Sequence, residues 1–373
     1  MIRLSKSSLT GSEKSAVIDV LDREFLGTGQ DVLQFEASLA DFFGRPAVCV
    51  VNGTAALHLA CQAVGLTGKD EVLVPSLTYV ASFQAISATG AKPVPCDVDP
   101  KSLTLNWRDA EKRLTNKTKA IMPVHYAGGV GDIEGVYSFA KQNELRVIED
   151  AAHAFGSEHD GVCVGGFGDI ACFSFDGIKN ITSGEGGCIV TQDELIIEKV
   201  CDARLLGVEH DTNRRYAGER SWDFDVSAQG WRYHMSNIMA AIGLEQLKRF
   251  SEIKQKRQQL ARRYDQMLAD NVAIIPMDHD YTSIVPHIYV VRVTELVDRD
   301  ALRRAMCDVG VQTGVHYKPN HLLSFYKNEN LLPLTVTESI FPTLITLPLH
   351  FDMSEEDVDF VCKQLCSFIN NQL

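Results

Sequence analysis

The chain has 373 residues, of which 45% are hydrophobic and 23% charged, a composition that excludes a disordered protein and predicts a sizeable core. Its net charge of -13 argues against a general nucleic-acid-binding surface, because such a surface needs clustered Lys and Arg. A small anionic substrate is still compatible with this charge, since a few donors can form a local positive pocket. Ten scattered cysteines without CxxC spacing predict no metal site, and the lack of a signal sequence or long apolar run predicts a cytoplasmic protein outside the membrane.

Short apolar runs alternate with helical stretches from about Gly53 to Val190, which predicts β-α units around a mostly parallel sheet. Apolar residues at helical spacing predict helices in TAALHLACQAVGL (54–66) and IEGVYSFAKQNE (133–144). The expected strands cover residues 47–51, 71–75, 92–98, 119–125, 145–150, 170–175 and 187–191. We therefore expect a large α/β domain whose seven-stranded sheet is flanked by helices.

The last third of the chain has a different pattern. Residues 236–271 predict one long helix that bridges two domains. Beyond it, HIYVVRV predicts a strand, and RDALRRAMCDVG and EEDVDFVCKQLCSFINNQ predict helices of a smaller C-terminal α+β domain. The expected division is a large domain with an N-terminal segment over residues 1–240, and a bridging helix with the small domain over residues 241–373.

The segment FSFDGIKNITSGEGG places Lys179 just after a predicted strand and just before a glycine-rich turn. A lysine that binds an aldehyde cofactor must lie in a shielded pocket, where desolvation or a neighbouring charge lowers its pKa. A loop that leaves the carboxyl end of a strand suits this role. Taken alone, Lys179 reads more readily as an ordinary surface lysine, because most lysines are solvated.

The segment VIEDAAHAFG ends an apolar strand in Asp150. A carboxylate beside the ring nitrogen of pyridoxal 5′-phosphate (PLP) keeps that nitrogen protonated, as its electron-sink chemistry requires. The alternative is that Asp150 caps the next helix. In VVNGTAALHLA, Gly53 and Thr54 begin a helix whose free amides suit a phosphate, although an ordinary capped helix looks the same.

These segments, taken together and in this order, resemble fold type I PLP enzymes, and more closely the DegT/DnrJ/EryC1/StrS family of sugar aminotransferases. The resemblance covers nearly the whole chain. The segments that carry it are FLGTGQDVLQFE, VNGTAALHLA, EVLVPSLTYVAS, EDAAHAFG, FSF with KNIT and GEGG, MSNIMAAIGLEQL, GVHYKP and LPLH.

The resemblance implies a role for each matching residue. Lys179 would carry the cofactor as a Schiff base, Asp150 would pair with the pyridine nitrogen, and His153 would lie near the phenolic oxygen. Tyr79 would stack on the cofactor ring, with core packing as the alternative. The residues that would hold the phosphate are Gly53, Thr54 and Ser174.

The chain departs from the family pattern at QGWRYHMSN, where relatives have G-x-N-Y-R-M. Arg232 stands at the position of an Asn that the neighbouring subunit supplies to the cofactor phosphate, and His234 at that of the Arg. Because arginine also binds phosphate well, Arg232 could keep this role, face a substrate diphosphate, or be a surface residue. The inherited contact implies a homodimer with active sites at the interface.

In the predicted small domain, VHYKPNH matches a segment that lies near the substrate in relatives. The resemblance implies that His316, Tyr317 and Lys318 bind substrate, with the last two meeting a diphosphate. An ordinary loop is the alternative.

The implied function is transfer of an amino group from L-glutamate, which becomes 2-oxoglutarate, through pyridoxamine 5′-phosphate (PMP) to a nucleotide-linked keto sugar. We expect a dTDP-4-keto-6-deoxyhexose, as in deoxyamino sugar biosynthesis for O-antigen and lipopolysaccharide, with a 3-keto sugar as the alternative. Family members that are sugar dehydratases have histidine in place of the lysine, so Lys179 favours amino transfer. A PLP lyase or racemase of amino acids, and a cofactor-holding protein without catalysis, are the competing hypotheses.

Overall fold

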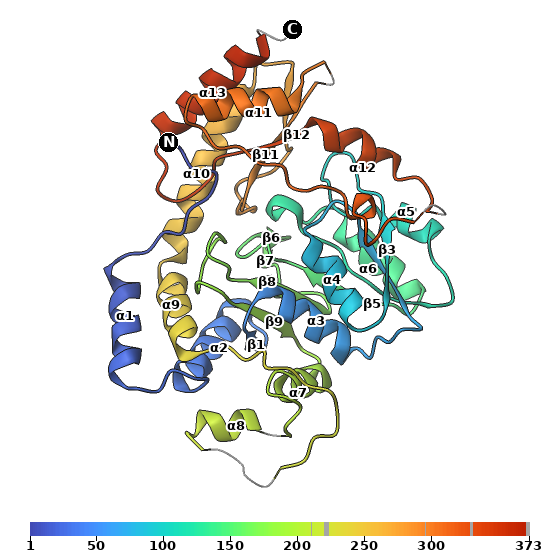
Figure 1. The fold of residues 1–373 in the computed structure, drawn as a ribbon, viewed down its shortest axis with the longest axis vertical. Helices are drawn as coiled ribbons and strands as arrows, with labels where there is room; N and C mark the ends of the chain where they lie inside the picture. The colour runs from blue at the N-terminus through green and yellow to red at the C-terminus, as the bar shows by residue number, and fades with distance from the viewer. Residues whose placement is uncertain (210, 220–223, 295, 329–330, 371–373) are drawn as a thin grey trace.

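A seven-stranded sheet forms the centre of the computed structural model, which describes residues 1–209, 211–219, 224–294, 296–328 and 331–370 (Figure 1). The strand order is β1-β9-β8-β5-β4-β2-β3, with the bounds β1 (Ala47–Val50), β2 (Glu71–Pro75), β3 (Lys92–Cys96), β4 (Thr118–Ile121), β5 (Arg146–Asp150), β8 (Ile170–Ser174) and β9 (Gly187–Thr191). The pairs β2-β3, β2-β4, β4-β5 and β5-β8 are parallel, whereas β9 is antiparallel to both β1 and β8. The predicted mostly parallel seven-stranded sheet is confirmed.

The sheet is apolar on both faces because a separate core covers each face. In β8, Ala171 and Phe173 point into one core, and Ile170 and Cys172 point into the other. Successive side chains of a strand point to opposite faces, so a strand between two cores needs an unbroken apolar run. This explains why the strands of the chain lack the alternation of polar and apolar residues.

Helices flank both faces of the sheet (Figure 1). The helices predicted over 54–66 and 133–144 are confirmed as α3 and α6. One core takes side chains from α3 (Gly53–Ala63), α4 (Val80–Ala88) and α7 (Glu194–Ala203). The other core takes them from α2 (Gln30–Phe43), α5 (Trp107–Lys112), α6 (Ile133–Gln142), α9 (Asn237–Lys248) and α10 (Phe250–Leu268).

The C-terminal part builds a second, antiparallel sheet from β10 (Ile274–Pro276), β11 (Tyr289–Val293) and β12 (Leu344–Leu347). Figure 1 shows α10 running from the large sheet toward this smaller one, against which α11 (Arg299–Asp308) and α13 (Glu355–Asn370) lie. The predicted smaller α+β unit is therefore confirmed. Residues 371 and 372 of the predicted last helix lie outside the described residues, and the domain boundary at residue 240, which falls inside α9, stays a prediction.

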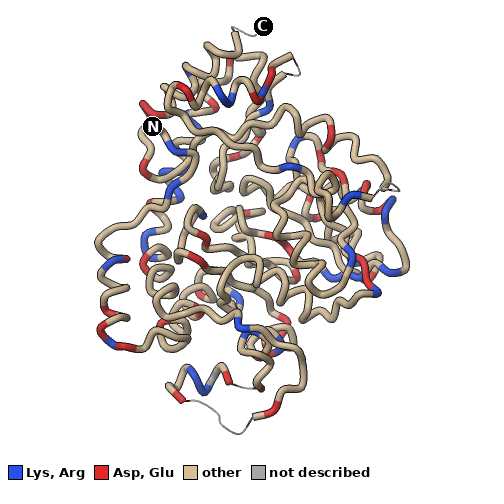
Figure 2. The backbone as a smooth tube through the Cα atoms, in the orientation of Figure 1, with Lys and Arg blue, Asp and Glu red and all other residues tan. Residues whose placement is uncertain are grey.

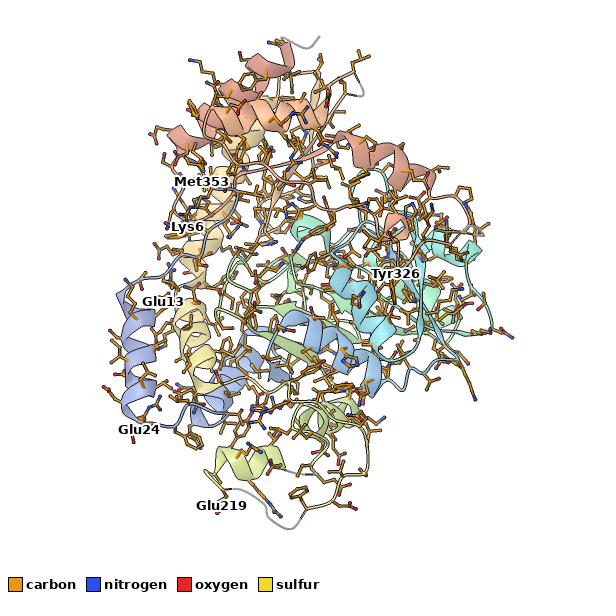
Figure 3. The ribbon with its side chains drawn as sticks, viewed as in Figure 1. Lys6, Glu13, Glu24, Glu219, Tyr326 and Met353 are labelled. Atoms are coloured by element: carbon orange, nitrogen blue, oxygen red, sulfur yellow. The ribbon has the colours of Figure 1, made fainter. Side chains whose placement is uncertain are left out.

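The prediction of one continuous helix over residues 236–271 is wrong, because the helix breaks at Arg249. Arg249 separates α9 from α10 with a backbone at φ -102° and ψ 13°. Its guanidinium donates to Glu13 Oε1 at 2.9 Å and to the carbonyl of Ser8 at 2.6 Å. Glu13 belongs to α1 (Gly11–Asp22), and its side chain accepts from Gln246 of α9 at 2.6 Å (Figure 3). The break is thus fixed by partners more than 230 residues away in sequence, which no local pattern reveals.

The remaining elements are short or lie at the edges of the molecule. They are α1 (Gly11–Asp22), η1 (Tyr126–Gly128), β6 (Glu158–His159), β7 (Val162–Cys163), α8 (Asp211–Tyr216), η2 (Asn320–Leu322), α12 (Thr335–Ile340) and η3 (Phe341–Thr343). Acidic and basic residues are interspersed along the chain in the view of Figure 2. Among the described residues, no helix is both long and apolar enough to cross a bilayer.

Candidate active site

A cavity of about 430 Å³ opens where the parallel strands β5 and β8 end. This edge of an open α/β sheet is where such folds bind ligands, because loops and helix N-termini converge there. The lining includes the start of α3, the end of β5, the loop after β8 and three residues of the C-terminal part. Residues predicted for the site that line this cavity are Gly53, Thr54, Tyr79, Asp150, His153, Ser174, Lys179, His316 and Tyr317.

Lys179 lies in the turn after β8 and is partly buried, so it is not an ordinary surface lysine. Its Nζ is 3.4 Å from Nε2 of His287. Desolvation lowers the pKa of the lysine amine to about 8, against the opposing charges of Asp150 and Asp176. An amine with this pKa is far more often unprotonated at neutral pH than a solvated lysine, as covalent and acid-base chemistry both require.

Asp150 ends β5, and its carboxylate is held by two donors. Ser82 Oγ donates to Oδ2 at 2.7 Å, and the amide of Ala152 donates to Oδ1 at 3.2 Å. Residues 151–157 form turns and bends, so the alternative that Asp150 caps a following helix does not hold. The side chain is instead buried, with 5% of its residue exposed, and it lines the cavity.

The start of α3 forms a cradle for an anion. The side chain of Asn52 accepts the amide of Ala55 at 2.8 Å, while the amides of Gly53 and Thr54 have no acceptor within the helix. A Cβ at Gly53 would lie 2.8 Å from Cβ of Ser174, so only glycine leaves this space open. The helix dipole favours negative charge at the same place.

His153 and Tyr317 form a polar pair on the wall of the cavity. The amide of Ala127 donates to His153 Nδ1 at 3.4 Å, which puts the ring proton on Nε2, 2.9 Å from the Tyr317 hydroxyl. Burial and the charge of Lys179 hold the pKa of His153 well below its usual range, so the ring is neutral. Nε2 therefore donates to the Tyr317 oxygen, and the hydroxyl proton of Tyr317 is left for another acceptor.

Tyr79 is 57% exposed and lines the cavity, so it does not pack in the core. Its ring lies 5.5 Å from that of Tyr317, measured between centroids. An exposed aromatic face beside a cavity suits a flat ligand ring.

Two predicted residues lie outside this cavity. Lys318 is exposed and does not line it. Arg232 is exposed as well and lines a separate hollow of about 290 Å³ together with Arg215 and His234. Burial and the neighbouring arginines lower the pKa of His234 to about 4. Glu24 and Glu219 line the same hollow, so its lining holds two arginines and two carboxylates.

Sequence reasoning missed two residues of the site, Ser82 and His287. Ser82 lies in the first turn of α4 and reaches Asp150 across 68 residues of sequence. His287 comes from the segment before β11, 108 residues after the lysine that it contacts. Ser82 is the last residue of EVLVPSLTYVAS, one of the segments that carry the family resemblance, whereas His287 belongs to none of them. The contact of Ser82 with Asp150 and that of His287 with Lys179 form only in the folded chain.

The residues of the cavity fit PLP. PLP combines an aldehyde, a ring nitrogen, a flat aromatic ring and a phosphate. For these groups the cavity offers, in the same order, an amine, a carboxylate, an aromatic face and an anion cradle that a Cβ would close. The volume of the cavity lies within the range of small-molecule sites, which is roughly 300–1,000 Å³.

Comparison with solved structures gives full-length matches. TlmJ, an aminotransferase from Streptoalloteichus hindustanus, is 32% identical, with a TM-score of 0.92 over 100% of this chain and 99% of that one. Spr1654 from Streptococcus pneumoniae, described as a sugar aminotransferase, is 30% identical in its PMP form, with a TM-score of 0.93 over 100% of both chains, and a PLP form also matches. DesI, solved in the presence of its TDP-sugar product, is 29% identical, with a TM-score of 0.88 over 97% of this chain and 91% of that one.

The comparison with protein families agrees with these matches, since the model of the DegT/DnrJ/EryC1/StrS aminotransferase family matches residues 7–366. The cofactor of these enzymes is PLP, which the cavity around Lys179 fits. The chain therefore belongs to the DegT/DnrJ/EryC1/StrS aminotransferase family and is a PLP-dependent sugar aminotransferase.

Proposed function

We propose that the enzyme transfers an amino group from L-glutamate to C4 of a dTDP-linked 4-keto-6-deoxyhexose. The main support for amino transfer is that Lys179, Asp150 and the start of α3 line one cavity. The likeness to DesI, which was solved with its TDP-sugar product, supports a dTDP-linked substrate. A 3-keto-6-deoxyhexose is the alternative, because the same groups could serve a ketone at either carbon.

Besides Lys179, which would bind the aldehyde, five residues would hold the cofactor. Bound PLP supplies an electron sink that makes the α-proton of the amino donor acidic enough to transfer. The amides of Gly53 and Thr54 and the hydroxyl of Ser174 would hold its phosphate. Asp150 would keep the ring nitrogen protonated, and Tyr79 would cover one face of the ring.

Gly53→Ala is expected to weaken PLP binding about tenfold or more, since overpacking costs about 1–3 kcal/mol and the new Cβ would displace Ser174. Titration of cofactor-free enzyme with PLP measures this effect. Gly11→Ala is the control, because no heavy atom lies within 4 Å of a Cβ at Gly11. Equal affinity in Gly53→Ala and wild type would rule out the cradle as the phosphate site.

Lys179 would move the proton in both halves of the reaction. It would take the proton from the α-carbon of glutamate and deliver it to the cofactor carbon on the other side of the amino nitrogen. With the sugar, it would move a proton in the opposite direction. With a pKa of about 8, about one lysine in ten is unprotonated at pH 7. The neutral pair of His153 and Tyr317 would orient the reacting groups through the free Tyr317 proton.

The C-terminal part would supply the substrate contacts. His316 and Tyr317 line the cavity and would meet the sugar. Lys318, exposed next to them in sequence, would meet the diphosphate as a positive charge at the entrance.

The proposed substrate can be tested in a single turnover. Enzyme in the PMP form is mixed with dTDP-4-keto-6-deoxyglucose or with the matching 3-keto sugar, and the product is identified by mass spectrometry and NMR. We expect the 4-amino sugar and return of the PLP spectrum with the first substrate only. Reaction with the 3-keto sugar alone would replace the C4 assignment, and the use of other amino acids in place of glutamate would replace the donor.

Amino-acid racemase or lyase chemistry shares the lysine and the aspartate. The same enzyme is therefore incubated with L-glutamate and L-alanine without any sugar. Formation of a D-amino acid or loss of a side chain at the rate of amino transfer would favour this second class. We expect one equivalent of 2-oxoglutarate per active site and no further turnover.

Arg232 is proposed to reach the cofactor phosphate or the diphosphate of a second copy in a homodimer. It is exposed, and it lines a hollow apart from the Lys179 cavity of its own chain. Both facts fit a residue that serves a neighbouring active site. We place this dimer in the cytoplasm, in the synthesis of deoxyamino sugars for O-antigen or a related lipopolysaccharide.

Mixing two inactive variants tests this contact. In a dimer of one Lys179→Ala and one Arg232→Ala chain, one site has both intact residues if Arg232 acts across the interface. Random exchange then restores about a quarter of the wild-type activity, because half of the dimers are mixed and each has one complete site. A mixture of Lys179→Ala and Asp150→Asn is the control and stays inactive. No recovery in mixed dimers would place Arg232 in the site of its own chain or outside any site.

A further inference from the structure

His287 contacts the reactive end of Lys179. The Nε2 atom of His287 lies 3.4 Å from the Nζ of Lys179, and both residues line the same cavity. The histidine is only 3% exposed. The contact joins the loop after β8 to the segment before β11, so the C-terminal part of the chain supplies the neighbour of the lysine.

Buried side chains donate hydrogen bonds to the backbone of the segment that contains His287. Arg257 of α10, 3% exposed, donates to the carbonyl of His287 at 3.1 Å and to that of Pro286 at 3.3 Å. Asn180, the residue after Lys179, donates to the carbonyl of Val285 at 3.2 Å. The position of the histidine ring relative to the lysine is therefore set from both sides.

The imidazole is uncharged. Burial, and then the charges of Lys179 and the other neighbours, hold the pKa of His287 well below its usual range. Its Nδ1 has no partner among the described residues, so this nitrogen can carry the ring proton. Nε2 is then an acceptor that faces the lysine amine.

We propose that His287 is a positioning residue for Lys179. Its Nε2 accepts a hydrogen bond from the lysine amine whenever that amine is not bonded to the cofactor. The bond holds Nζ in the cavity, where the amine must take up and return the proton of the substrate. This inference rests on the proposed role of Lys179 and adds to it the residue that keeps the released lysine in place.

The first experiment measures the titration of Lys179 in cofactor-free enzyme. Acetylation by trace acetic anhydride is followed at each pH by mass spectrometry of the Lys179 peptide. Wild type should show a midpoint near the lysine pKa of about 8. Other titratable or charged groups around the lysine are Asp150, Asp176, His153, His316 and Arg257, and all variants keep them.

His287→Leu removes the acceptor, so the charged form of Lys179 loses a partner and its midpoint falls. A fall of about one unit raises labelling at pH 7 about fivefold. His287→Gln keeps an acceptor and should stay close to wild type. His279→Gln is the matched control, because it changes a histidine of the same connection between β10 and β11 that does not line the cavity.

The second experiment follows the reaction of the PLP enzyme with glutamate and with glutamate deuterated at the α-carbon. In His287→Leu we expect at least a tenfold slower maximal rate, little change in the concentration for half-maximal rate, and a larger isotope effect. His287→Gln should recover most of the rate. His287→Asn, whose shorter amide falls short of Nζ, replaces the Leu variant if that protein does not fold.

An unchanged midpoint together with an unchanged isotope effect in the folded variant overturns the proposal. If Lys179 did not have the proposed catalytic role, Lys179→Ala would still react with glutamate. This result differs from the one that overturns the role of His287. The two ideas can therefore fail separately.

Discussion

Lys179→Ala is expected to lower the rate of amino transfer by at least about 10³-fold, because the side chain would both bind the cofactor and move the proton. The near-visible absorbance of bound PLP should shift to that of the free aldehyde. Treatment of wild type with borohydride should attach the cofactor to the Lys179 peptide, as seen by mass spectrometry, and the variant should remain unlabelled.

The matched control is Lys199→Ala, which removes an exposed lysine of α7 that does not line the cavity. Added methylamine should restore part of the lost rate in Lys179→Ala by supplying a free base, whereas a general folding defect would not respond. Full activity in Lys179→Ala, or borohydride labelling at another lysine, would contradict the assignment.

Asp150→Asn is expected to slow both half-reactions on the order of a hundredfold. The loss of a neighbouring negative charge lowers the pKa of the cofactor ring nitrogen by about two units, so the ring is less often protonated. Stopped-flow measurement of the reaction with glutamate gives the rate. Because Asn keeps the size of the side chain and can still accept from Ser82, the cavity should be preserved.

Asp160→Asn serves as the control, since it makes the same change at an exposed position between β6 and β7. PLP that is methylated at its ring nitrogen carries a fixed positive charge. With this cofactor the rates of Asp150→Asn and wild type should differ less. Equal rates in Asp150→Asn and wild type with natural PLP would exclude the carboxylate from this role.

The strands of the large sheet could be predicted from sequence because each contains a short apolar run. β5 ends at Asp150 and β8 ends at Ser174, so the strand ends also marked the site. One usable local signal was passed over, the capping box formed by Thr10 and Glu13 at the start of α1. The break at Arg249 had no such signal, since distant partners fix it.

The site was predictable only in part for a related reason. Asp150 ends a strand, Gly53 begins a helix, and Lys179 lies in the loop after a strand. The family resemblance implied a role for each of them. His287 lies in an ordinary stretch of the C-terminal part, and its importance depends on a contact with Nζ that forms only in the folded chain. Residues that act through tertiary contacts leave no periodic or spacing pattern to detect.

The side chains of β8 point alternately into two cores, and this limits which mutations the strand can accept. Loss of one codon inside β8 would turn Phe173 toward the opposite core and draw Ser174 and Lys179 back by one strand rise, about 3.3 Å. Exchange of one apolar residue for another would leave both where they are. Mutation in this strand is therefore expected to exchange apolar residues of similar volume and to leave the number of residues unchanged.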